Sequence, residues 1–146
     1  MLKQLDDSMA NMQVNNRPLK VGHTLTITGI PKTGDGRFQF NILSGSDIAF
    51  HMGVRFDETI VAYNTCQAGV WGAEVHQGGF PLPKPKTLKV VSLGLSSKSS
   101  GLPVSRSFLV LLSDGSEVHF PNRLGKCEYL DFSFDEGVLI RSFEIN

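Results

Sequence analysis

The segment from Ile48 to Phe56 constrains the fold of this chain more than any other stretch. Its apolar side chains fall at every second position, and His51, Gly53 and Arg55 lie between them. On a β-strand, a period of two sends alternate side chains to opposite faces of the sheet. The pattern therefore predicts a strand with one buried apolar face and one face that carries a histidine and an arginine side by side.

The same alternation recurs in short segments along the rest of the chain, and turn-forming residues separate these segments. Leu25 and Ile27 alternate with threonines, and the pair Asp114-Gly115 between two apolar segments is typical of a hairpin. No segment has the period of an amphipathic helix. The 15 glycines and 7 prolines are consistent with many turns. The spacing predicts about ten or eleven short strands, one of them from Trp71 to His76, which indicates an all-β sandwich or barrel.

Length, charge and cysteine content limit the class of protein. The 146 residues are expected to form one domain at 17–146, preceded by a polar N-terminal arm at residues 1–16. A formal net charge of zero argues against nucleic acid as a partner. No apolar run approaches the roughly 18 residues of a membrane span, so membrane insertion is not expected. Cys66 and Cys127 are too few for a disulfide framework and are expected to be reduced thiols.

Polar and aromatic residues at fixed spacing mark the region from position 51 to position 81. They are His51, Arg55, Phe56, Val61, Asn64, Trp71, Gly72, Glu74, Phe80 and Pro81. This set resembles the motif of the galectins, the β-galactoside-binding lectins, which reads His-x-Asn-Pro-Arg-Phe, Val-x-x-Asn, Trp-Gly-x-Glu-x-Arg and Phe-Pro. The downstream run Phe120-Pro121-Asn122-Arg123-Leu124 is also similar to the family's pattern. The resemblance covers residues 17–146.

The resemblance implies a fold and a role for each matching residue. The fold would be a galectin-type jelly roll, a sandwich of two antiparallel sheets with roughly 11 strands. By resemblance, His51 and Arg55 would bind the axial 4-hydroxyl of galactose, and Asn64 and Glu74 would bind its 6-hydroxyl. Glu74 would also hold Arg55 in place. The single tryptophan, Trp71, would stack on the apolar face of the sugar, which favours a partly exposed ring.

The chain departs from the galectin motif at three positions. Gly53 replaces the asparagine, Val54 replaces the proline, and His76 replaces the last arginine. Loss of one hydrogen bond at position 53 costs about 0.5–1.5 kcal/mol, a roughly threefold to tenfold loss of affinity. The glycine also opens space beside His51. Histidine is the side chain that changes charge at physiological pH, so sugar binding would depend on pH if the His76 ring reaches Glu74. Gly53 and His76 are therefore included among the candidate sugar-binding positions.

Two classes of function remain after this comparison. The first is a carbohydrate-binding lectin for β-galactosides such as lactose and N-acetyllactosamine, with weakened or altered specificity. The second is a galectin-fold protein that has lost galactoside binding and acts through protein contacts or binds a different glycan, such as a chitin-type oligosaccharide. The two differ in a simple test, because only a lectin loses its ligand when Trp71 or Glu74 is replaced by alanine.

An enzyme is not expected. A retaining glycosidase needs two neighbouring carboxylates, and Glu74 has no evident acidic partner on its own strand. The four histidines and two cysteines lack the spacing of metal ligands, so neither a metal nor a cofactor is expected.

The expected partners are galactose-containing glycans and glycoproteins, and a homodimer through the terminal strands stays open. The N-terminus lacks the apolar segment of a signal peptide, which predicts cytoplasmic synthesis. The resemblance implies export by a route that needs no signal peptide, followed by extracellular action.

Overall fold

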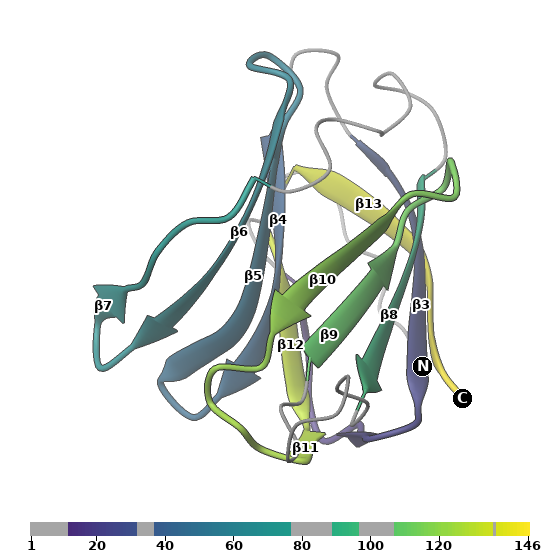
Figure 1. The fold of residues 1–146 in the computed structure, drawn as a ribbon. Coiled ribbons are helices and arrows are strands. Elements are labelled where there is room, and N and C mark those ends of the chain that lie inside the picture. The colour runs from purple at the N-terminus through teal and green to yellow at the C-terminus, as the bar shows by residue number, and fades with distance from the viewer. Residues whose placement is uncertain (1–11, 32–36, 77–88, 97–106, 136) are drawn as a thin grey trace.

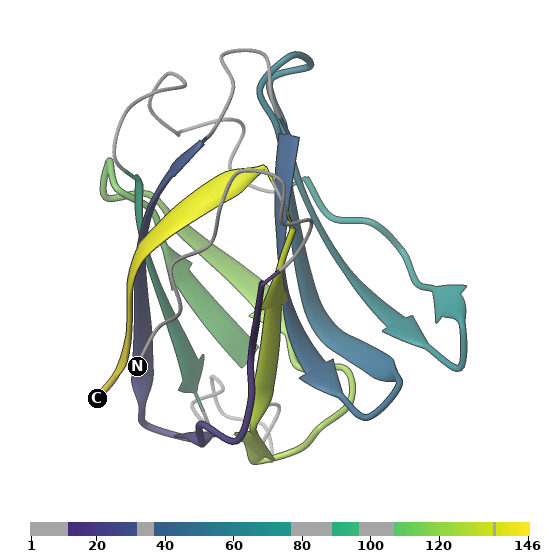
Figure 2. The same cartoon turned by 180° about the vertical axis from the view of Figure 1, so that it is seen from behind.

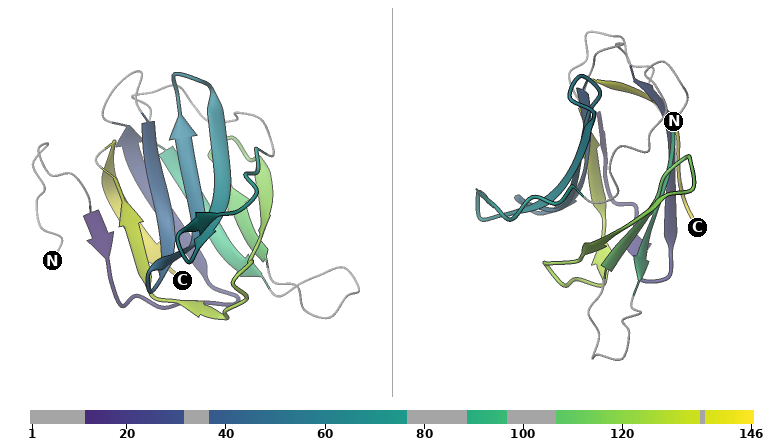
Figure 3. Two further views of the ribbon diagram at one scale, coloured as in Figure 1. Left: turned by 90° about the vertical axis from the view of Figure 1, so that its left-hand side faces the viewer. Right: turned by 45° about the horizontal axis from the view of Figure 1, so that its top comes forward.

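The computed structural model describes residues 12–31, 37–76, 89–96, 107–135 and 137–146. These residues form antiparallel β-structure, in which two large sheets of six and five strands face each other (Figure 1; Figure 3, right). A small two-stranded sheet lies at one end of the sandwich. The expected all-β sandwich of two antiparallel sheets is confirmed.

Each sheet combines strands from distant parts of the chain. In spatial order, the six-stranded sheet contains β1 (Met12–Val14), β12 (Asp131–Phe134), β4 (Arg37–Ser44), β5 (Asp47–Arg55), β6 (Ile60–Gln67) and β7 (Val70–Trp71). The five-stranded sheet contains β10 (Glu117–Pro121), β9 (Ser107–Leu111), β8 (Lys89–Ser96), β3 (Thr24–Pro31) and β13 (Val138–Ile145). The small sheet pairs β2 (Leu19–Lys20) with β11 (Glu128–Tyr129). Strand β1 is an edge strand beside β12 (Figure 2) and lies within the segment interpreted as an arm.

The hydrophobic core fills the space between the two large sheets, and aromatic rings dominate it. The ring of Phe50 on β5 packs against Phe108 and Phe120 of the opposite sheet, with centroid distances of 5.2 and 5.7 Å. Each fully buried side chain of this size contributes about 1.5–3 kcal/mol of transfer free energy. The core therefore holds β5 and β6 in place, so the side chains on the outer face of these strands have a rigid support.

Strand β5 shows the predicted alternation over most of its length. Phe50, Met52 and Val54 are at most 1% exposed, whereas His51 and Arg55 lie on the outer face. The pattern is wrong at the start of the strand, where the register with β6 shifts between positions 48 and 51. A bulge there lets two consecutive residues face the core, so position 49 is buried and position 48 only partly so.

Two other expectations have opposite outcomes. The hairpin at Asp114-Gly115 is confirmed, since it joins β9 and β10 and Ser116 N–H donates to the Asp114 carboxylate at 2.9 Å. The strand expected over positions 71–76 is wrong in length, because β7 ends at Trp71 and the chain returns to β6 only through a bridge between Tyr63 and Val75.

The described residues contain no helix with the length and apolarity that crossing a membrane requires.

Candidate functional site

The outer face of the six-stranded sheet brings the candidate residues of β5, β6 and β7 together (Figure 3, left). His51 on β5 lies directly opposite Asn64 on β6, and β7 continues the sheet beyond β6. Residues paired in register point to the same face of a sheet. The two polar side chains are therefore neighbours on a surface whose other side is the hydrophobic core.

His51 is held by contacts on two sides. Its Nδ1 lies 2.7 Å from the side-chain oxygen of Asn41 on β4. Its ring meets the Trp71 indole edge-on, with the ring centroids 5.0 Å apart. Burial lowers the pKa of His51, and the positive charge of Arg55 lowers it further, whereas the Glu74 carboxylate opposes both effects. The imidazole is thus held in its neutral form near pH 7.

Trp71 offers an exposed apolar surface beside this histidine. The side chain is 49% exposed although it is the largest apolar residue of the chain. The expectation of a partly exposed ring is confirmed. An exposed tryptophan at a sheet edge, in contact with a polar ring, provides the flat surface on which a sugar ring can lie.

The ion pairs around Arg55 correct one expectation. The Arg55 guanidinium lies 3.8 Å from the carboxylate of Glu58, while Glu74 pairs with His76. Arg37 is opposite Arg55 on the neighbouring strand and binds both Asp57 and Glu58. The turn after β5 thus supplies carboxylates to two adjacent arginines. Among the ion pairs of the described residues, Arg55 pairs with Glu58 and not with Glu74, which differs from the pairing that the resemblance implied.

Asn64 uses its side chain to fix the backbone after β7. It is 5% exposed, and its amide nitrogen donates to the carbonyl of Gly72 at 3.0 Å. Its side-chain oxygen accepts from the Thr65 N–H at 2.7 Å and from the Arg123 guanidinium at 3.1 Å. The amide is therefore largely committed to internal hydrogen bonds, so its first role in the site is to position the segment that follows Trp71.

Arg123 completes this support from the loop after β10. Its guanidinium donates to the carbonyl of Ala73 at 2.9 Å and lies over the Phe120 ring, 4.8 Å from the centroid. A Cβ at Gly72 would come within 2.8 Å of the same guanidinium, so glycine is needed for this close approach. Side chains take the carbonyls of positions 72 and 73, which explains why the expected strand ends at Trp71.

Glu74 and His76 form a pair on the exposed end of this segment. The Glu74 carboxylate lies 2.5 Å from Nε2 of His76, and both side chains are about half exposed. The shorter histidine therefore does reach Glu74. The other oxygen of the carboxylate has no hydrogen-bond partner among the described residues, and a carboxylate can accept at both of its oxygens.

Gly53 leaves space next to Nε2 of His51. A Cβ built at this position would lie 3.0 Å from His51 Nε2, closer than an ordinary contact. The glycine therefore leaves room beside Nε2, the imidazole nitrogen that does not face Asn41.

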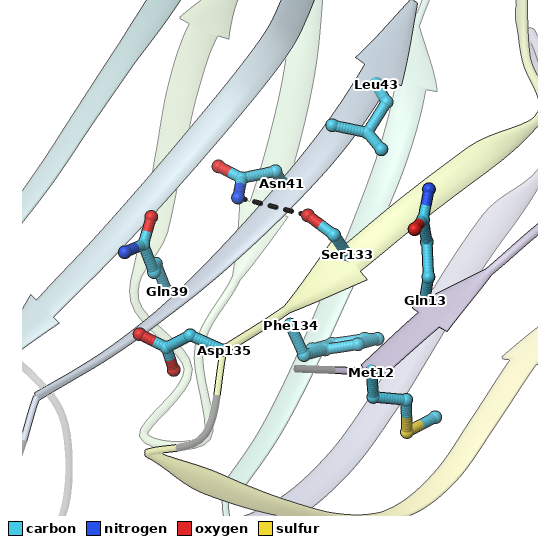
Figure 4. Close-up of a pocket in the computed structure, with 8 residues that line it drawn as sticks. All are labelled: Met12, Gln13, Gln39, Asn41, Leu43, Ser133, Phe134 and Asp135. Atoms are coloured by element: carbon cyan, nitrogen blue, oxygen red, sulfur yellow. Dashed lines mark hydrogen bonds between the residues drawn. The ribbon is translucent and has the colours of Figure 1, made fainter. Parts of the chain in front are cut away.

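A groove of about 380 Å³ lies on the same sheet, beside the histidine and across β4, β12 and β1 (Figure 4). Its walls are mostly polar and include Gln39, Asn41 and Ser133. Asn41 belongs both to this groove and to the hydrogen bond of His51. The groove and the candidate site are therefore connected through one side chain.

Among the described side chains, no group of three or more histidine, cysteine, aspartate or glutamate residues could hold a metal ion.

Comparison with known proteins gives the family. A family model described as galactoside-binding lectin matches residues 10–145. The chain belongs to the galactoside-binding lectin family. Its similarity to individual members of this lectin family extends over most of its length.

Two curated lectins and one crystal structure illustrate the similarity. The chain is 33% identical over 120 residues to a β-galactoside-binding lectin of Electrophorus electricus, covering 79% of this chain and 86% of that one. It is 30% identical over 135 residues to galectin-2 of Homo sapiens, covering 92% and 96%. The crystal structure of the Dario rerio galectin-1-L2 superposes with a TM-score of 0.81 at 36% identity and covers 92% of this chain and 99% of that one.

In this galactoside-binding lectin family member, the candidate positions of the sequence motif lie in one neighbourhood. His51, Arg55 and Asn64 come from the inner strands, and Trp71 and Glu74 come from the adjoining edge. Gly53 and His76 also border this area. Phe80 and Pro81 lie outside the described residues.

Several supporting residues of the site were not identified from the sequence. Arg123 was part of the motif, yet its role is visible only in space, because it is 59 positions from Asn64. Asn41 and Ser133 looked like ordinary polar positions of alternating strands. Glu58 lies in the turn between β5 and β6. The alternating pattern held no signal for these contacts, because Asn41 comes to lie opposite His51 and Ser133 only through the register of the sheet.

Proposed function

We propose that this chain binds β-galactosides on the outer face of β5, β6 and β7, as expected of a galactoside-binding lectin. The contact between Trp71 and His51 carries the proposal: a 49% exposed indole touches a neutral imidazole, with Arg55 and Glu74 nearby. A galactose ring has an apolar C–H face for the indole and hydroxyl groups for the polar side chains. The rigid core beneath β5 and β6 favours binding because little conformational entropy is lost.

The first test is a titration with lactose and N-acetyllactosamine while tryptophan fluorescence is recorded. Trp71 is the only tryptophan, so any spectral change reports on the proposed surface. A saturable shift is expected with both sugars and not with sucrose or mannose. No shift up to tens of millimolar lactose would contradict the proposal, and a glycan array would then decide between another sugar and a protein partner.

Replacing Trp71 by alanine should weaken lactose binding about tenfold to a hundredfold, since burial of an aromatic ring is worth about 1.5–3 kcal/mol. Isothermal titration calorimetry measures this change, because the variant has no tryptophan signal. Trp71 is exposed, so the variant should unfold at a temperature close to that of the unmodified protein. Unchanged lactose affinity would place the sugar elsewhere.

Glu74→Ala has a matched control in the same chain. Glu117 and His119 on β10 form a similar exposed pair two positions apart, with 3.7 Å between carboxylate and imidazole. Glu74→Ala should abolish measurable lactose binding, whereas Glu117→Ala should leave it unchanged. Equal effects of the two substitutions would show that the loss is a general effect of removing a surface charge.

We also propose that the chain forms a two-fold dimer through its terminal strands. Strands β1 and β13 are edge strands of the two large sheets, so each has one side without a neighbouring strand within the described sheets. A groove of about 500 Å³ lies between them and is lined by residues of both. Sedimentation equilibrium should give twice the monomer mass at micromolar concentration, and a monomer mass there would contradict the dimer.

A further inference from the structure

Three side chains form a line of hydrogen bonds across the outer face of the six-stranded sheet. Asn41 on β4 is opposite Ser133 on β12 in one direction and opposite His51 on β5 in the other. Its amide nitrogen donates to the Ser133 hydroxyl at 3.2 Å (Figure 4), and its oxygen lies 2.7 Å from His51 Nδ1. Ser133, Asn41 and His51 thus form a chain of hydrogen bonds that runs from the groove to the candidate sugar site.

The direction of these bonds decides the state of the imidazole. An amide oxygen can only accept a hydrogen bond, so the nitrogen of His51 that faces it must carry the proton. A neutral imidazole has one N–H and one lone pair. With the proton on Nδ1, the lone pair is on Nε2.

Nε2 has no hydrogen-bond partner among the described residues, because the one bond of the His51 ring is made by Nδ1. A Cβ at Gly53 would lie 3.0 Å from Nε2, so the glycine leaves room beside this nitrogen. The charged groups that act on the ring are Arg55 on the same strand and Glu74 beyond β7. Burial and Arg55 both favour the neutral ring, so the lone pair persists near pH 7.

We propose that Asn41, oriented by Ser133, is a positioning residue that holds His51 as the Nδ1–H tautomer and so presents Nε2 as an acceptor for a sugar hydroxyl. The sugar part of this statement rests on the proposed function. The tautomer does not, because it is a property of the protein without ligand.

The tautomer can be read directly from the nitrogen-15 chemical shifts of the histidine rings above neutral pH. His51 should show a protonated Nδ1 and an unprotonated Nε2, and its signals are assigned by their loss in His51→Gln. His23 is an internal reference of the opposite kind, since the Lys20 N–H donates to its Nδ1 at 3.2 Å. If His51 shares the pattern of His23, with the proton on Nε2, the proposal is wrong.

Two substitutions at position 41 separate positioning from packing. Asn41→Leu keeps the branched shape of the side chain but removes the acceptor, so His51 should populate both tautomers and lactose affinity should fall roughly threefold to tenfold. Asn41→Asp keeps an acceptor, so the tautomer and the affinity should persist at pH 8. Its carboxylate should raise the pKa of His51, and affinity should then decline at a higher pH than in the unmodified protein.

Ser133→Ala should have a smaller effect in the same direction as Asn41→Leu. Gln13→Ala is the matched control, because it lines the same groove from β1 without contacting His51 or Asn41. Thermal unfolding confirms that each variant is folded. A common loss of affinity without any tautomer change would show that Asn41 acts only through packing.

The outcomes separate this proposal from the proposed function. If the unmodified protein binds no lactose but His51 is the Nδ1–H tautomer and Asn41→Leu disturbs it, the positioning role stands and the galactoside assignment fails. If lactose binds and Asn41→Leu changes neither the tautomer nor the affinity, the positioning role is wrong and the lectin assignment stands.

Discussion

The two halves of the proposed sugar site are held in different ways. One half lies on the inner strands β5 and β6, and the other depends on the segment at residues 72–76. His51 and Asn64 stand in a regular ladder, above a core in which Phe50 and Tyr63 are completely buried. The segment after Trp71 contacts β6 through a bridge at Val75 and a hydrogen bond from the Gly72 N–H to the Thr65 carbonyl. Side chains of Asn64 and Arg123 bind its carbonyls. A ladder follows from the pattern of the strand itself, whereas a side-chain support depends on residues far away in the sequence.

The difference has a consequence for binding. The polar residues of the inner strands are positioned before any ligand arrives, because the core fixes their strands. Trp71 and Glu74 supply much of the expected contact area, yet their backbone is held by a few exchangeable hydrogen bonds. We therefore expect a single substitution elsewhere in the chain to displace Trp71 and Glu74 more easily than His51 and Asn64.

The strongest test of this difference is Arg123→Ala. It removes the hydrogen bond to the Ala73 carbonyl in the 72–76 segment, a second one to Asn64, and the contact with the Phe120 ring. Partly exposed charged hydrogen bonds of this kind are worth about 1–2 kcal/mol. Lactose affinity should fall about tenfold, and Trp71 fluorescence should change in the absence of ligand. Arg141→Ala on β13 is the control and should alter neither property. Normal affinity in Arg123→Ala would show that the segment keeps its shape without this support.

A pair of buried tyrosines extends the comparison to stability. The Tyr63 hydroxyl on β6 is buried without a hydrogen-bond partner among the described residues, and burial raises the pKa of this phenol well above its usual range. The Tyr129 hydroxyl instead donates to Asn122 at 2.5 Å, and Asn122 lies in the loop that carries Arg123. Tyr63→Phe should raise the free energy of unfolding by about 1 kcal/mol, whereas Tyr129→Phe should lower it by about 1 kcal/mol.

Urea unfolding measures both changes, and the slope with denaturant should be the same in each variant. A loss of stability in Tyr63→Phe would mean that its hydroxyl has a partner, such as a buried water. Tyr129→Phe should in addition weaken lactose binding slightly, since it loosens the loop of Arg123.

The same contrast explains how much could be predicted from the sequence. The strand at Asp47–Arg55 and the outward position of His51 followed from a period of two, because burial of an apolar face depends on local pattern alone. The strand expected after Trp71 was wrong because the carbonyls of positions 72 and 73 are bound by the side chains of Asn64 and Arg123. No local pattern contains that information.

The charge contacts were also beyond a local pattern. The resemblance paired Arg55 with Glu74, but the turn after β5 brings Glu58 closer. Asn41 lies on the same face of the sheet as His51, and its hydrogen bond to His51 depends on the register between β4 and β5. Register between strands is set by the whole sheet, so alternation predicts the face of a residue but not its neighbour.

Gly53 offers a smaller test, confined to the inner strands. In Gly53→Ala the added carbon would lie 3.0 Å from His51 Nε2, so the ring must shift and lactose affinity should fall about threefold. Gly53→Asn adds a side-chain amide and should bind lactose roughly threefold to tenfold more tightly than Gly53→Ala. Gly45→Asn, at a turn where nothing lies within 4 Å, is the control. Tighter binding by Gly53→Ala than by the unmodified protein would show that the open space has no role.

The pH profile of lactose binding gives the smallest expected effect and distinguishes the two histidines. Burial lowers the pKa of His51 below its ordinary 6.5, so the neutral acceptor should persist as the pH falls through 6.5. The unfolded chain takes up the proton more readily than the folded one, and the stability from this group should therefore decline only below that pH. Affinity measured by tryptophan fluorescence should stay level from pH 8 to 6.5 and fall below it. His76→Gln should leave the part of the profile that comes from His51 unchanged, because His51 is on β5. A decline already near pH 7 that disappears in His76→Gln would instead assign the pH dependence to the pair of Glu74 and His76, in the half of the site that the ladder does not hold.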